Sequence, residues 1–338
     1  MIAIRADANE QIGTGHVMRC LSVADALLSF GEKVLFITAD HRGDELIISR
    51  GFETVCLDSD WTKMDDELEA LKELINESHP TKLLVDSYYV TESYFKAMSP
   101  IIDIAYFDDM NACRWDVGHL INYNIFANSL DYSEYSETNT EMLLGPTYAP
   151  LRKEFKCVTP HLISEQITDV LVSAGGADPA GITELLMERV CSKMPHINFH
   201  FVVGALNPRI DSIKQLETEN VLLHINETHI SQLMRKCDVA ISAAGTTLYE
   251  LCACGIPTIT FTLADNQLIA ASEFEKQEVM INSGDSRDNP IFPERVTACL
   301  KELAEDMHKR REYSEKMQNL VDGHGAETIA RRLLKKEK

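Results

Sequence analysis

The sequence predicts an α/β protein built from two doubly wound, parallel-sheet domains, and three observations support this prediction. Short runs rich in Val, Ile and Leu alternate with amphipathic stretches, as expected for parallel strands that helices cover on both faces. A stretch over residues 143–160 with three prolines interrupts the alternation, which then restarts. Glycine-containing turns follow several of the strand-like runs, at the positions where α/β folds bind ligands.

Six strand-like runs in the first half are expected to be parallel strands. They cover residues 2–7, 33–40, 53–58, 82–89, 103–109 and 119–124. Amphipathic stretches at 16–30 and 63–78 are expected to be helices between them. The first of these helices ends at Gly31, a natural C-terminal stop. Its apolar face combines Val17, Leu21, Ala24 and Leu28.

The second half repeats the pattern. Its strand-like runs cover residues 169–176, 198–204, 221–226, 238–245 and 257–262. Residues 294–338 read as one or two charged helices, interrupted at 322–327. We expect a first domain over 1–150, a second over 151–320, and a C-terminal helix over 321–338 that packs back on the first domain. Two such halves predict an interdomain cleft, with ligands at the carboxyl ends of the strands.

Composition excludes several classes of function. The net charge of −21 argues against nucleic acid and against stable association with an anionic membrane. The nine cysteines form no C-x-x-C pair and are expected to be reduced thiols of a cytoplasmic protein. The chain opens on a strand-like run, so no signal peptide is expected, and no apolar run approaches the ~18 residues that span a bilayer. The sequence leaves the oligomeric state open, and a monomer is compatible with it.

The first glycine-containing turn, Gly13-Thr14-Gly15-His16, joins a strand to a helix. It lacks the third glycine of a dinucleotide fingerprint and the Lys of a P-loop. His16 falls in the first helical turn, where the helix dipole disfavours the imidazolium, so a neutral general base is expected. The alternative is a histidine that caps or packs the turn. Arg19 lies one turn further along this helix. Two roles are open for it: contact with a phosphate, or pairing with a carboxylate such as Asp86 or Asp108.

Turns of the second half offer phosphate-binding groups. Residues 244–247 (Ala244, Gly245, Thr246, Thr247) open a helix whose free N–H groups at 245–247 and two hydroxyls can hold a diphosphate, and Glu250 can accept from ribose hydroxyls. The alternative is a capping box between Thr247 and Glu250. The turn at 172–178 contains Gly175 and Gly176, for which we consider two interpretations. The glycines wrap around a nucleotide, or they simply form a tight turn. Asn266 and Gln267 begin a later helix, for which an ordinary N-cap is the alternative.

Polar residues also end strands of the first half and are expected to face the cleft. They are Asp86, Tyr88, Asp108 and Asp109. Asp109 can equally be a turn residue. Asp58-Ser59-Asp60 matches a short metal-binding pattern, but an acidic loop accounts for it better, and no His/Cys cluster has zinc spacing. We therefore predict no metal and no other cofactor.

Together these stretches resemble the UDP-sugar hydrolases of the pseudaminic acid pathway and the related spore-coat polysaccharide proteins. The resemblance covers almost the whole chain in order. It rests on residues 4–27, 85–90, 106–132, 143–155, 242–251 and 255–267. The second-half motif is also similar to the UDP-GlcNAc-dependent enzyme that completes lipid II. Such enzymes have the GT-B fold, with two Rossmann-like domains.

The resemblance implies metal-free hydrolysis of a UDP-2,4-diacetamido-2,4,6-trideoxyhexose, with inversion at C1. It makes His16 the base, puts Tyr88, Asn266 and Gln267 in the substrate site, and gives the helix start at 245–250 to UDP. Thr246 and Thr247 depart from the family pattern at the phosphates. The alternatives are a GT-B glycosyltransferase that uses a UDP-amino sugar and a silent nucleotide-sugar-binding protein. Flagellin, capsule and spore coat are all compatible destinations.

Overall fold

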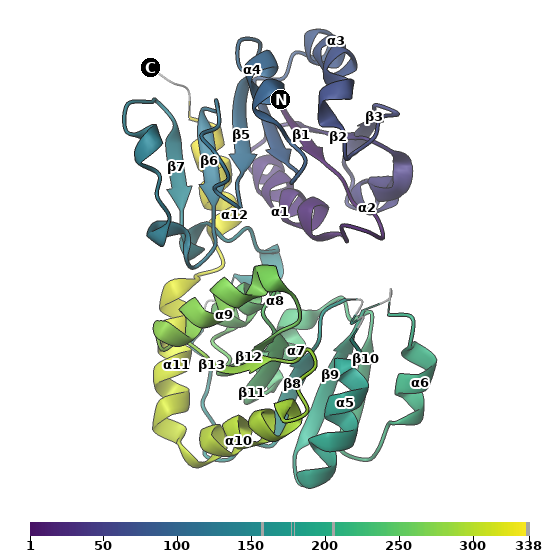
Figure 1. Cartoon of the computed structure of the whole chain (residues 1–338), viewed down its shortest axis with the longest axis vertical. Coiled ribbons are helices and arrows are strands. Elements are labelled where there is room, and N and C mark those ends of the chain that lie inside the picture. The colour runs from purple at the N-terminus through teal and green to yellow at the C-terminus, as the bar shows by residue number, and fades with distance from the viewer. Residues whose placement is uncertain (157–158, 177, 179, 205–206, 336–338) are drawn as a thin grey trace. The chain divides into compact units, whose positions relative to one another are not determined.

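The computed structural model describes residues 1–156, 159–176, 178, 180–204 and 207–335. The chain forms two compact units (Figure 1). Unit 1 comprises Met1–Lys153 together with His324–Lys338, and unit 2 comprises Glu154–Gly323. Each unit is an α/β domain with a parallel sheet of its own. Within the described residues, no helix is both long enough and apolar enough to cross a membrane.

Unit 1 contains a seven-stranded parallel sheet with the order β3-β2-β1-β4-β5-β6-β7. The strands are β1 (Ile2–Ala6), β2 (Val34–Thr38), β3 (Glu53–Cys56), β4 (Lys82–Asp86), β5 (Asp103–Phe107), β6 (His119–Asn122) and β7 (Glu141–Leu144). The order reverses between β1 and β4, which is the switch point where doubly wound sheets bind ligands. Sequence analysis missed β7 because this short edge strand runs straight into the proline-containing stretch.

The helices of unit 1 include α1 (Gly15–Ser29), α2 (Asp44–Ser49), α3 (Leu68–Ser78), α4 (Glu92–Met98) and α12 (Gly325–Leu333). Most of α1 is buried, which fits its place over the sheet. The expected apolar face is wrong in one position, because Leu28 is 55% exposed whereas Leu27 is fully buried. Leu27 lies seven residues after Cys20, or about two helical turns, so both residues are on the buried face of α1. Leu28 lies outside this face.

Unit 2 contains a six-stranded parallel sheet with the order β10-β9-β8-β11-β12-β13. The strands are β8 (Asp169–Ser173), β9 (Asn198–Val203), β10 (Val221–Ile225), β11 (Val239–Ala243), β12 (Thr258–Thr262) and β13 (Ile281–Asp285). The helices are α5 (Ile182–Arg189), α6 (Ile210–Gln215), α7 (Ile230–Lys236), α8 (Thr247–Cys254), α9 (Asp265–Lys276), α10 (Phe292–Glu305) and α11 (Met307–Leu320). Sequence analysis missed β13 because its sequence, INSGD, has a single large apolar residue.

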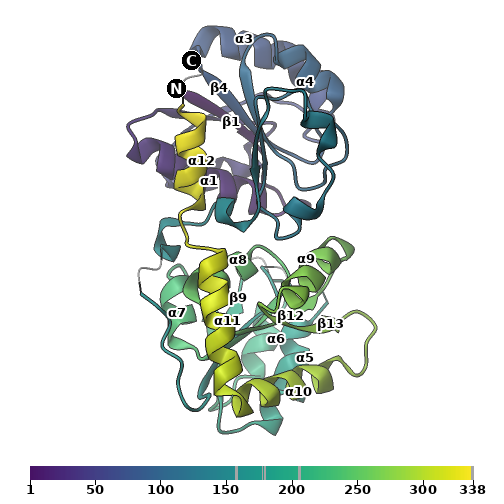
Figure 2. The same cartoon turned by 90° about the vertical axis from the view of Figure 1, so that its left-hand side faces the viewer.

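The C-terminal region corrects a second expectation. It forms three helices, α10, α11 and α12, where one or two were expected. The additional break falls at Asp306, whose side chain caps α11 by accepting from the Lys309 amide at 2.8 Å. The last helix, α12, packs along α1 of unit 1 (Figure 2). Arg332 of α12 also pairs with Glu141 of β7 at 2.8 Å.

The packing of α12 on unit 1 makes a testable prediction. Ile329→Ala should lower the free energy of unfolding of unit 1 by roughly 2–5 kcal/mol, because Ile329 is fully buried and its truncation leaves a cavity. Both tryptophans, Trp61 and Trp115, are in unit 1, so their fluorescence during urea unfolding reports on this unit. Lys335→Ala, at an exposed position beyond the helix, should change stability by less than about 0.5 kcal/mol. Equal stability of the two variants would contradict the prediction.

Candidate functional site

The loop between β1 and α1 is closed by its own backbone. The Gly13 amide donates to the Asn9 carbonyl at 2.8 Å, and the Asn9 amide donates back to Gly13 at 3.3 Å. Gly13 has φ of +73°, a conformation that glycine adopts without strain. A Cβ atom on Gly13 or Gly15 would meet nothing within 4 Å. The loop therefore leaves open space beside the start of α1.

His16 lies in the first turn of α1 and is held by a buried carboxylate. Its Nδ1 is 2.5 Å from Oδ1 of Asp86, the last residue of β4, and the two side chains are 8% and 0% exposed. Tyr88 packs edge-on against the imidazole, with ring centroids 4.6 Å apart. A carboxylate at Nδ1 favours the tautomer whose Nε2 carries the free lone pair, which is the form that a general base needs.

The structure adds a partner that the sequence did not place beside His16. Asp86 puts an ionised, buried carboxylate in contact with the imidazole. The expectation of a neutral general base at His16 stays a prediction. His16 does not cap the helix, since the N-cap residue of α1 is Thr14.

Arg19 is a partner of carboxylates, which resolves the choice left open by the sequence. Its Nε and Nη2 donate to the two oxygens of Asp86 at 2.6 and 2.5 Å. Its Nη1 donates to Asp109 at 2.8 Å and to the Tyr123 hydroxyl at 3.1 Å. Of the two carboxylates that the sequence offered, Asp86 is the partner, and Asp109 instead of Asp108 is a second one. The guanidinium also lies over the ring of Phe107, 4.7 Å from its centroid.

This arrangement keeps Asp86 ionised. Burial alone would raise the pKa of the Asp86 carboxyl, but the charges and hydrogen bonds of Arg19 and His16 hold this pKa well below its ordinary value. The thiol of Cys20 adds a weak hydrogen bond, with Sγ 3.5 Å from Oδ2. The carboxylate therefore stays charged in a buried position because donors surround it.

Asp108 and Asp109 have different surroundings although they are adjacent. Asp109 accepts from the Tyr88 hydroxyl at 3.1 Å and from the Asn124 side chain at 3.2 Å. Asp108 accepts from the amides of Met110 and Asn111 and so caps the turn after β5. Its Oδ2 is buried and has no hydrogen-bond partner among the described residues, and burial raises the pKa of this carboxyl. Asp109 therefore belongs to the His16 network, whereas Asp108 serves the turn.

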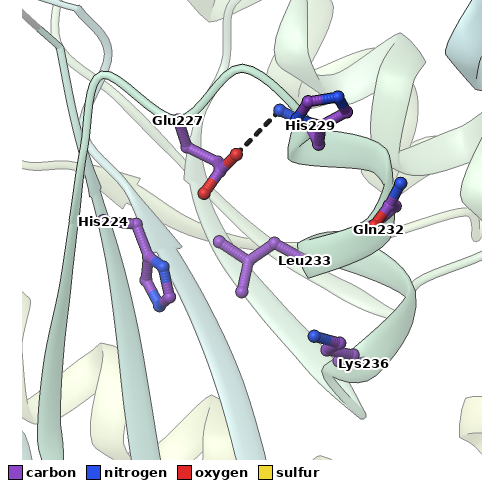
Figure 3. A pocket seen from close by; sticks show the side chains of 6 residues that line it. All are labelled: His224, Glu227, His229, Gln232, Leu233 and Lys236. Atoms are coloured by element: carbon purple, nitrogen blue, oxygen red, sulfur yellow. Dashed lines mark hydrogen bonds between the residues drawn. The ribbon is translucent and has the colours of Figure 1, made fainter.

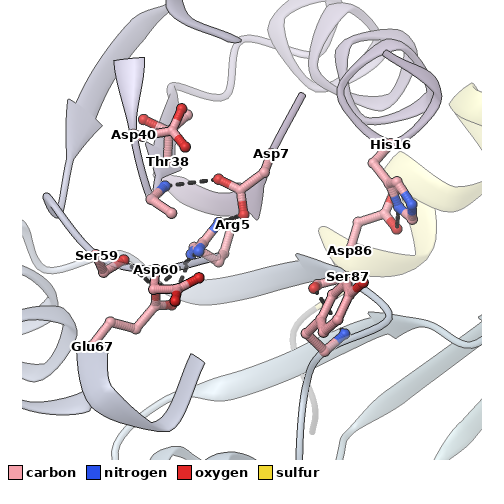
Figure 4. Close-up of polar contacts among 12 residues, drawn as sticks. Arg5, Asp7, His16, Thr38, Asp40, Ser59, Asp60, Glu67, Asp86 and Ser87 are labelled. Carbon is pink, nitrogen blue, oxygen red and sulfur yellow. Dashed lines mark hydrogen bonds and ion pairs between the residues drawn. The ribbon is translucent and has the colours of Figure 1, made fainter. Parts of the chain in front are cut away.

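A small depression lies beside His16 and Asp86. It is lined by Asp7, Ile12, His16, Asp86, Ser87, Tyr88 and Tyr89. Asp7 is fixed by a neighbouring buried cluster, because Arg5 donates to Asp7 at 2.6 Å and to both oxygens of Glu67 at 2.8 Å (Figure 4). Asp7 also accepts from the Ala39 amide at 2.7 Å.

Sequence analysis missed two residues of this region, Asp7 and Tyr123. Asp7 follows directly after β1, and Tyr123 follows directly after β6. The rule that polar residues at strand carboxyl ends face the ligand would have selected both. It was applied to β4 and β5 but not to β1 and β6.

Unit 2 brings the other predicted residues to one sheet edge. Gly175 and Gly176 follow β8, Ala244–Thr246 follow β11, and Asn266 and Gln267 lie just after β12. These three strands are neighbours and parallel, so their carboxyl ends share an edge. Gly175, with φ of +84°, and Gly245 are both exposed. Ala177 of the same glycine turn lies outside the described residues, and Asp178 caps α5 through the amides of Ile182 and Thr183.

The start of α8 differs in detail from the expectation. The helix begins at Thr247, with Thr246 as its N-cap and no side-chain capping bond there. The capping-box alternative is wrong in its register, because it requires Thr247 at the N-cap. The Gly245 amide is not free either, since it donates to the Ala243 carbonyl at 2.8 Å. First-turn amides of a helix lack intrahelical partners, so the predicted anion-binding groups at this helix start reduce to those of Thr246 and Thr247.

The start of α9 holds the Asn-Gln pair. Asn266 is exposed in the first turn, whereas the Gln267 side-chain carbonyl accepts from the Leu263 amide at 2.8 Å. The N-cap is Ala264, which makes no side-chain capping bond, so the ordinary N-cap alternative is wrong as well. Gln267 instead closes the turn between β12 and α9.

A larger pocket in unit 2, of about 310 Å³, contains none of the predicted residues. Its walls come from the end of β10 and from α7 (Figure 3). The lining residues are His224, Glu227, His229, Gln232, Leu233 and Lys236. His224 is joined to His200 at 3.0 Å, and burial together with His200 lowers the pKa of His224. In the sequence, this pocket could have been noticed from two histidines, His224 near the end of β10 and His229 just before α7.

Comparison with known proteins supports this architecture. Residues 185–333 match the model of the glycosyltransferase family 28 C-terminal domain. MurG of Acinetobacter baumannii superposes with a TM-score of 0.71 at 13% identity, over 98% of both chains. A spinosyn rhamnosyltransferase superposes with a TM-score of 0.67 at 13% identity, over 99% of both chains. The expected GT-B fold, with two Rossmann-like domains, is therefore confirmed.

Similar sequences include proteins of both named and unnamed activity. An uncharacterized protein of Methanocaldococcus jannaschii is 26% identical over 79% of this chain, which spans 56% of that protein's length. The spore coat polysaccharide biosynthesis protein SpsG of Bacillus subtilis is 23% identical over 84% of this chain and 83% of its own. The UDP-2,4-diacetamido-2,4,6-trideoxy-β-L-altropyranose hydrolase of Campylobacter jejuni is 24% identical over 74% of this chain and 86% of its own length.

The buried Asp86 charge makes a prediction about stability. At neutral pH, Asp86→Asn should lower the free energy of unfolding of unit 1 by about 3–5 kcal/mol, because Arg19 loses its main partner in a buried position. Because the pKa of Asp86 is lower in the folded than in the unfolded chain, its charge stabilises the fold above about pH 4, and this stabilisation is lost as the pH falls towards the folded-state pKa. The difference in free energy of unfolding between wild type and Asp86→Asn should therefore become smaller in acid. Urea unfolding followed by tryptophan fluorescence at pH 7 and at about pH 3 measures both.

The control for this prediction is Asp116→Asn, which removes an exposed carboxylate of the same unit. It should leave stability within about 0.5 kcal/mol of wild type. A difference for Asp86→Asn that stays constant or widens on acidification would contradict the assignment of a buried, ionised carboxylate.

Proposed function

We propose that this chain hydrolyses a UDP-2,4-diacetamido-2,4,6-trideoxyhexose, releasing UDP with inversion at C1, in nonulosonic acid biosynthesis of the pseudaminic type. The observation that carries the proposal is the buried dyad in which Asp86 holds Nδ1 of His16 at 2.5 Å. The name of the Campylobacter jejuni relative supports the substrate, and the family 28 match over unit 2 supports a nucleotide-sugar site there.

In the proposed reaction, Nε2 of His16 takes a proton from a water molecule. The water oxygen bonds to C1 of the sugar on the face opposite UDP, while the bond from C1 to the phosphate oxygen breaks and UDP leaves with its electron pair. Asp86 stabilises the imidazolium that forms, as the carboxylate does in a Ser-His-Asp triad. The glycines at 13 and 15 provide the room for water and sugar beside the ring.

The remaining residues of unit 1 hold the base and the sugar. Arg19 anchors Asp86 and Asp109 together, which fixes the imidazole against Tyr88. Tyr88 is 48% exposed, so it is available to the amide and hydroxyl groups of the sugar, while Asp109 accepts from its hydroxyl. Asp108 would contribute through the turn that it caps rather than through direct contact, because it is fully buried.

Unit 2 would bind the nucleotide. The amides and hydroxyls of Thr246 and Thr247 at the start of α8 suit the diphosphate, whose departure the helix dipole favours. Glu250, one turn on, suits the ribose hydroxyls. Gly175 and Gly176 on the neighbouring strand end would allow the nucleotide close to the backbone. Asn266, at the next strand end, would meet the sugar or the phosphate, with Gln267 shaping that turn.

A glycosyl transfer by the same residues is the second candidate. The family 28 C-terminal domain match and the likeness to MurG favour it. In that reaction His16 would deprotonate an acceptor hydroxyl instead of water. A nucleotide-sugar-binding protein without turnover is the third candidate, and the intact His16-Asp86 dyad speaks against it.

Incubation with a panel of UDP-diacetamido-trideoxy sugars distinguishes the three candidates. We expect release of UDP in water alone, unaffected by EDTA, with a free sugar whose first-formed anomer is inverted; ¹H and ³¹P NMR measure all three properties. Release that requires an added acceptor would establish the transferase instead. Binding of UDP without release from any member of the panel would leave only the binding protein.

The role of His16 is tested by His16→Gln. Turnover should fall by about 10²–10⁴-fold, because that is the usual contribution of a positioned base, whereas the affinity for UDP measured by calorimetry should stay within about twofold. His79→Asn, an exposed histidine of the same unit, should keep full turnover. Near-normal turnover of His16→Gln would remove His16 from the mechanism, and a matching loss of UDP affinity would make it a binding residue.

A further inference from the structure

Three side chains of the types that ligate metals come together from two segments, beyond the ends of β2 and β3. His41 lies in the short helix η1 (His41–Gly43) that follows β2, Cys56 is the last residue of β3, and Asp58 comes two residues later. One ligand atom of each lies within 4.8 Å of the other two. Fifteen positions separate His41 from Cys56, which is why the sequence showed no zinc-type spacing.

His41 has the kind of hydrogen-bond partner that supports metal-bound histidines. Its Nδ1 donates to Asp44 at 2.6 Å, and the other oxygen of Asp44 accepts from the hydroxyls of Thr38 and Thr54 at 3.2 and 3.0 Å. This leaves Nε2 as the nitrogen with the free lone pair. A carboxylate on the far ring nitrogen is the usual support of a histidine ligand, because it fixes the tautomer and makes the nitrogen more basic.

The cysteine and the aspartate form a paired unit. The Cys56 thiol is half-buried, and its Sγ lies 3.5 Å from a carboxylate oxygen of Asp58. The Asp58 amide donates to the same sulfur at 3.4 Å. Asp58 has φ of +53°, and this left-handed backbone conformation turns the chain back beside the sulfur.

We propose that His41, Cys56 and Asp58 bind a thiophilic divalent cation of the Zn²⁺ class, with a fourth position open to water or another ligand. Nitrogen, sulfur and carboxylate oxygen are the ligands that Zn²⁺ takes, whereas a thiolate disfavours Mg²⁺ and Ca²⁺. On binding, the bond from sulfur to the metal forms, and the thiol proton passes to solvent.

This cation site is separate from the proposed reaction site. β3 and β2 lie on one side of β1 in the sheet, and β4, which carries Asp86, lies on the other. The metal would join η1 to the end of β3 and would take no part in the chemistry at His16. The proposal therefore stands or falls independently of the proposed function.

Titration of the EDTA-treated, desalted full chain with Co²⁺ alone tests the proposal. We expect one equivalent to bind, with a near-ultraviolet sulfur-to-cobalt charge-transfer band that Zn²⁺ then abolishes by displacement. Cys56→Ser should remove the band. Asp58→Asn and His41→Gln should each weaken the affinity for Co²⁺ by about tenfold or more, because each removes one of three protein ligands.

Matched controls lie close by. Cys113→Ser removes another half-buried thiol of unit 1, and Asp60→Asn removes the second carboxylate of the Asp58-Ser59-Asp60 segment; both should keep the band and the affinity. The proposal is overturned if wild type gives no band, if the band survives Cys56→Ser, or if Asp60→Asn weakens binding as much as Asp58→Asn. If metal-free Cys56→Ser fails to fold by circular dichroism, the comparison of Asp58→Asn with Asp60→Asn decides.

Discussion

Unit 1 is organised around the need to keep one buried carboxylate charged. Asp86 is almost inaccessible to water, so its charge is tolerable only if donors surround it. α1 supplies two of them, His16 and Arg19, which lie three residues apart and so face the same strand end. Arg19 in turn needs a second carboxylate, which Asp109 provides beyond β5. The orientation of the imidazole and the position of Arg19 follow from this one constraint.

The fold was largely predictable from the sequence because hydrophobic runs and glycine stops mark parallel strands and helices clearly. The exceptions are physical. β7 and β13 are short edge strands, and an edge strand needs no continuous apolar run because only one neighbour covers it. Leu28 was assigned to the wrong face because one residue turns a helix by about 100°. The break at Asp306 carries no glycine or proline and was invisible for that reason.

The sequence predicted many of the residues of the candidate site, but not which of them form hydrogen bonds or ion pairs with one another. Strand-end position selected Asp86, Asp109 and Tyr88, yet the bond between His16 and Asp86 exists only because β4 lies next to β1 in the sheet. Nothing local distinguishes Asp108 from Asp109, since the turn after β5 decides which one meets Arg19. The same holds in unit 2, where the amide of Gly245 turned out to be engaged by its own turn. The cluster of His41, Cys56 and Asp58 depends wholly on the pairing of β2 with β3.

The docking of α12 on α1 has a consequence for how the chain folds as it is made. Residues 1–153 contain the whole sheet of unit 1, but the flank of α1 stays uncovered until residues 324–335 have been synthesised, after all of unit 2. During translation, unit 2 can therefore complete its core while unit 1 still exposes apolar surface. Unit 1 is therefore synthesised first but completed last. Its helix α1, which carries His16, lacks its packing partner α12 until then.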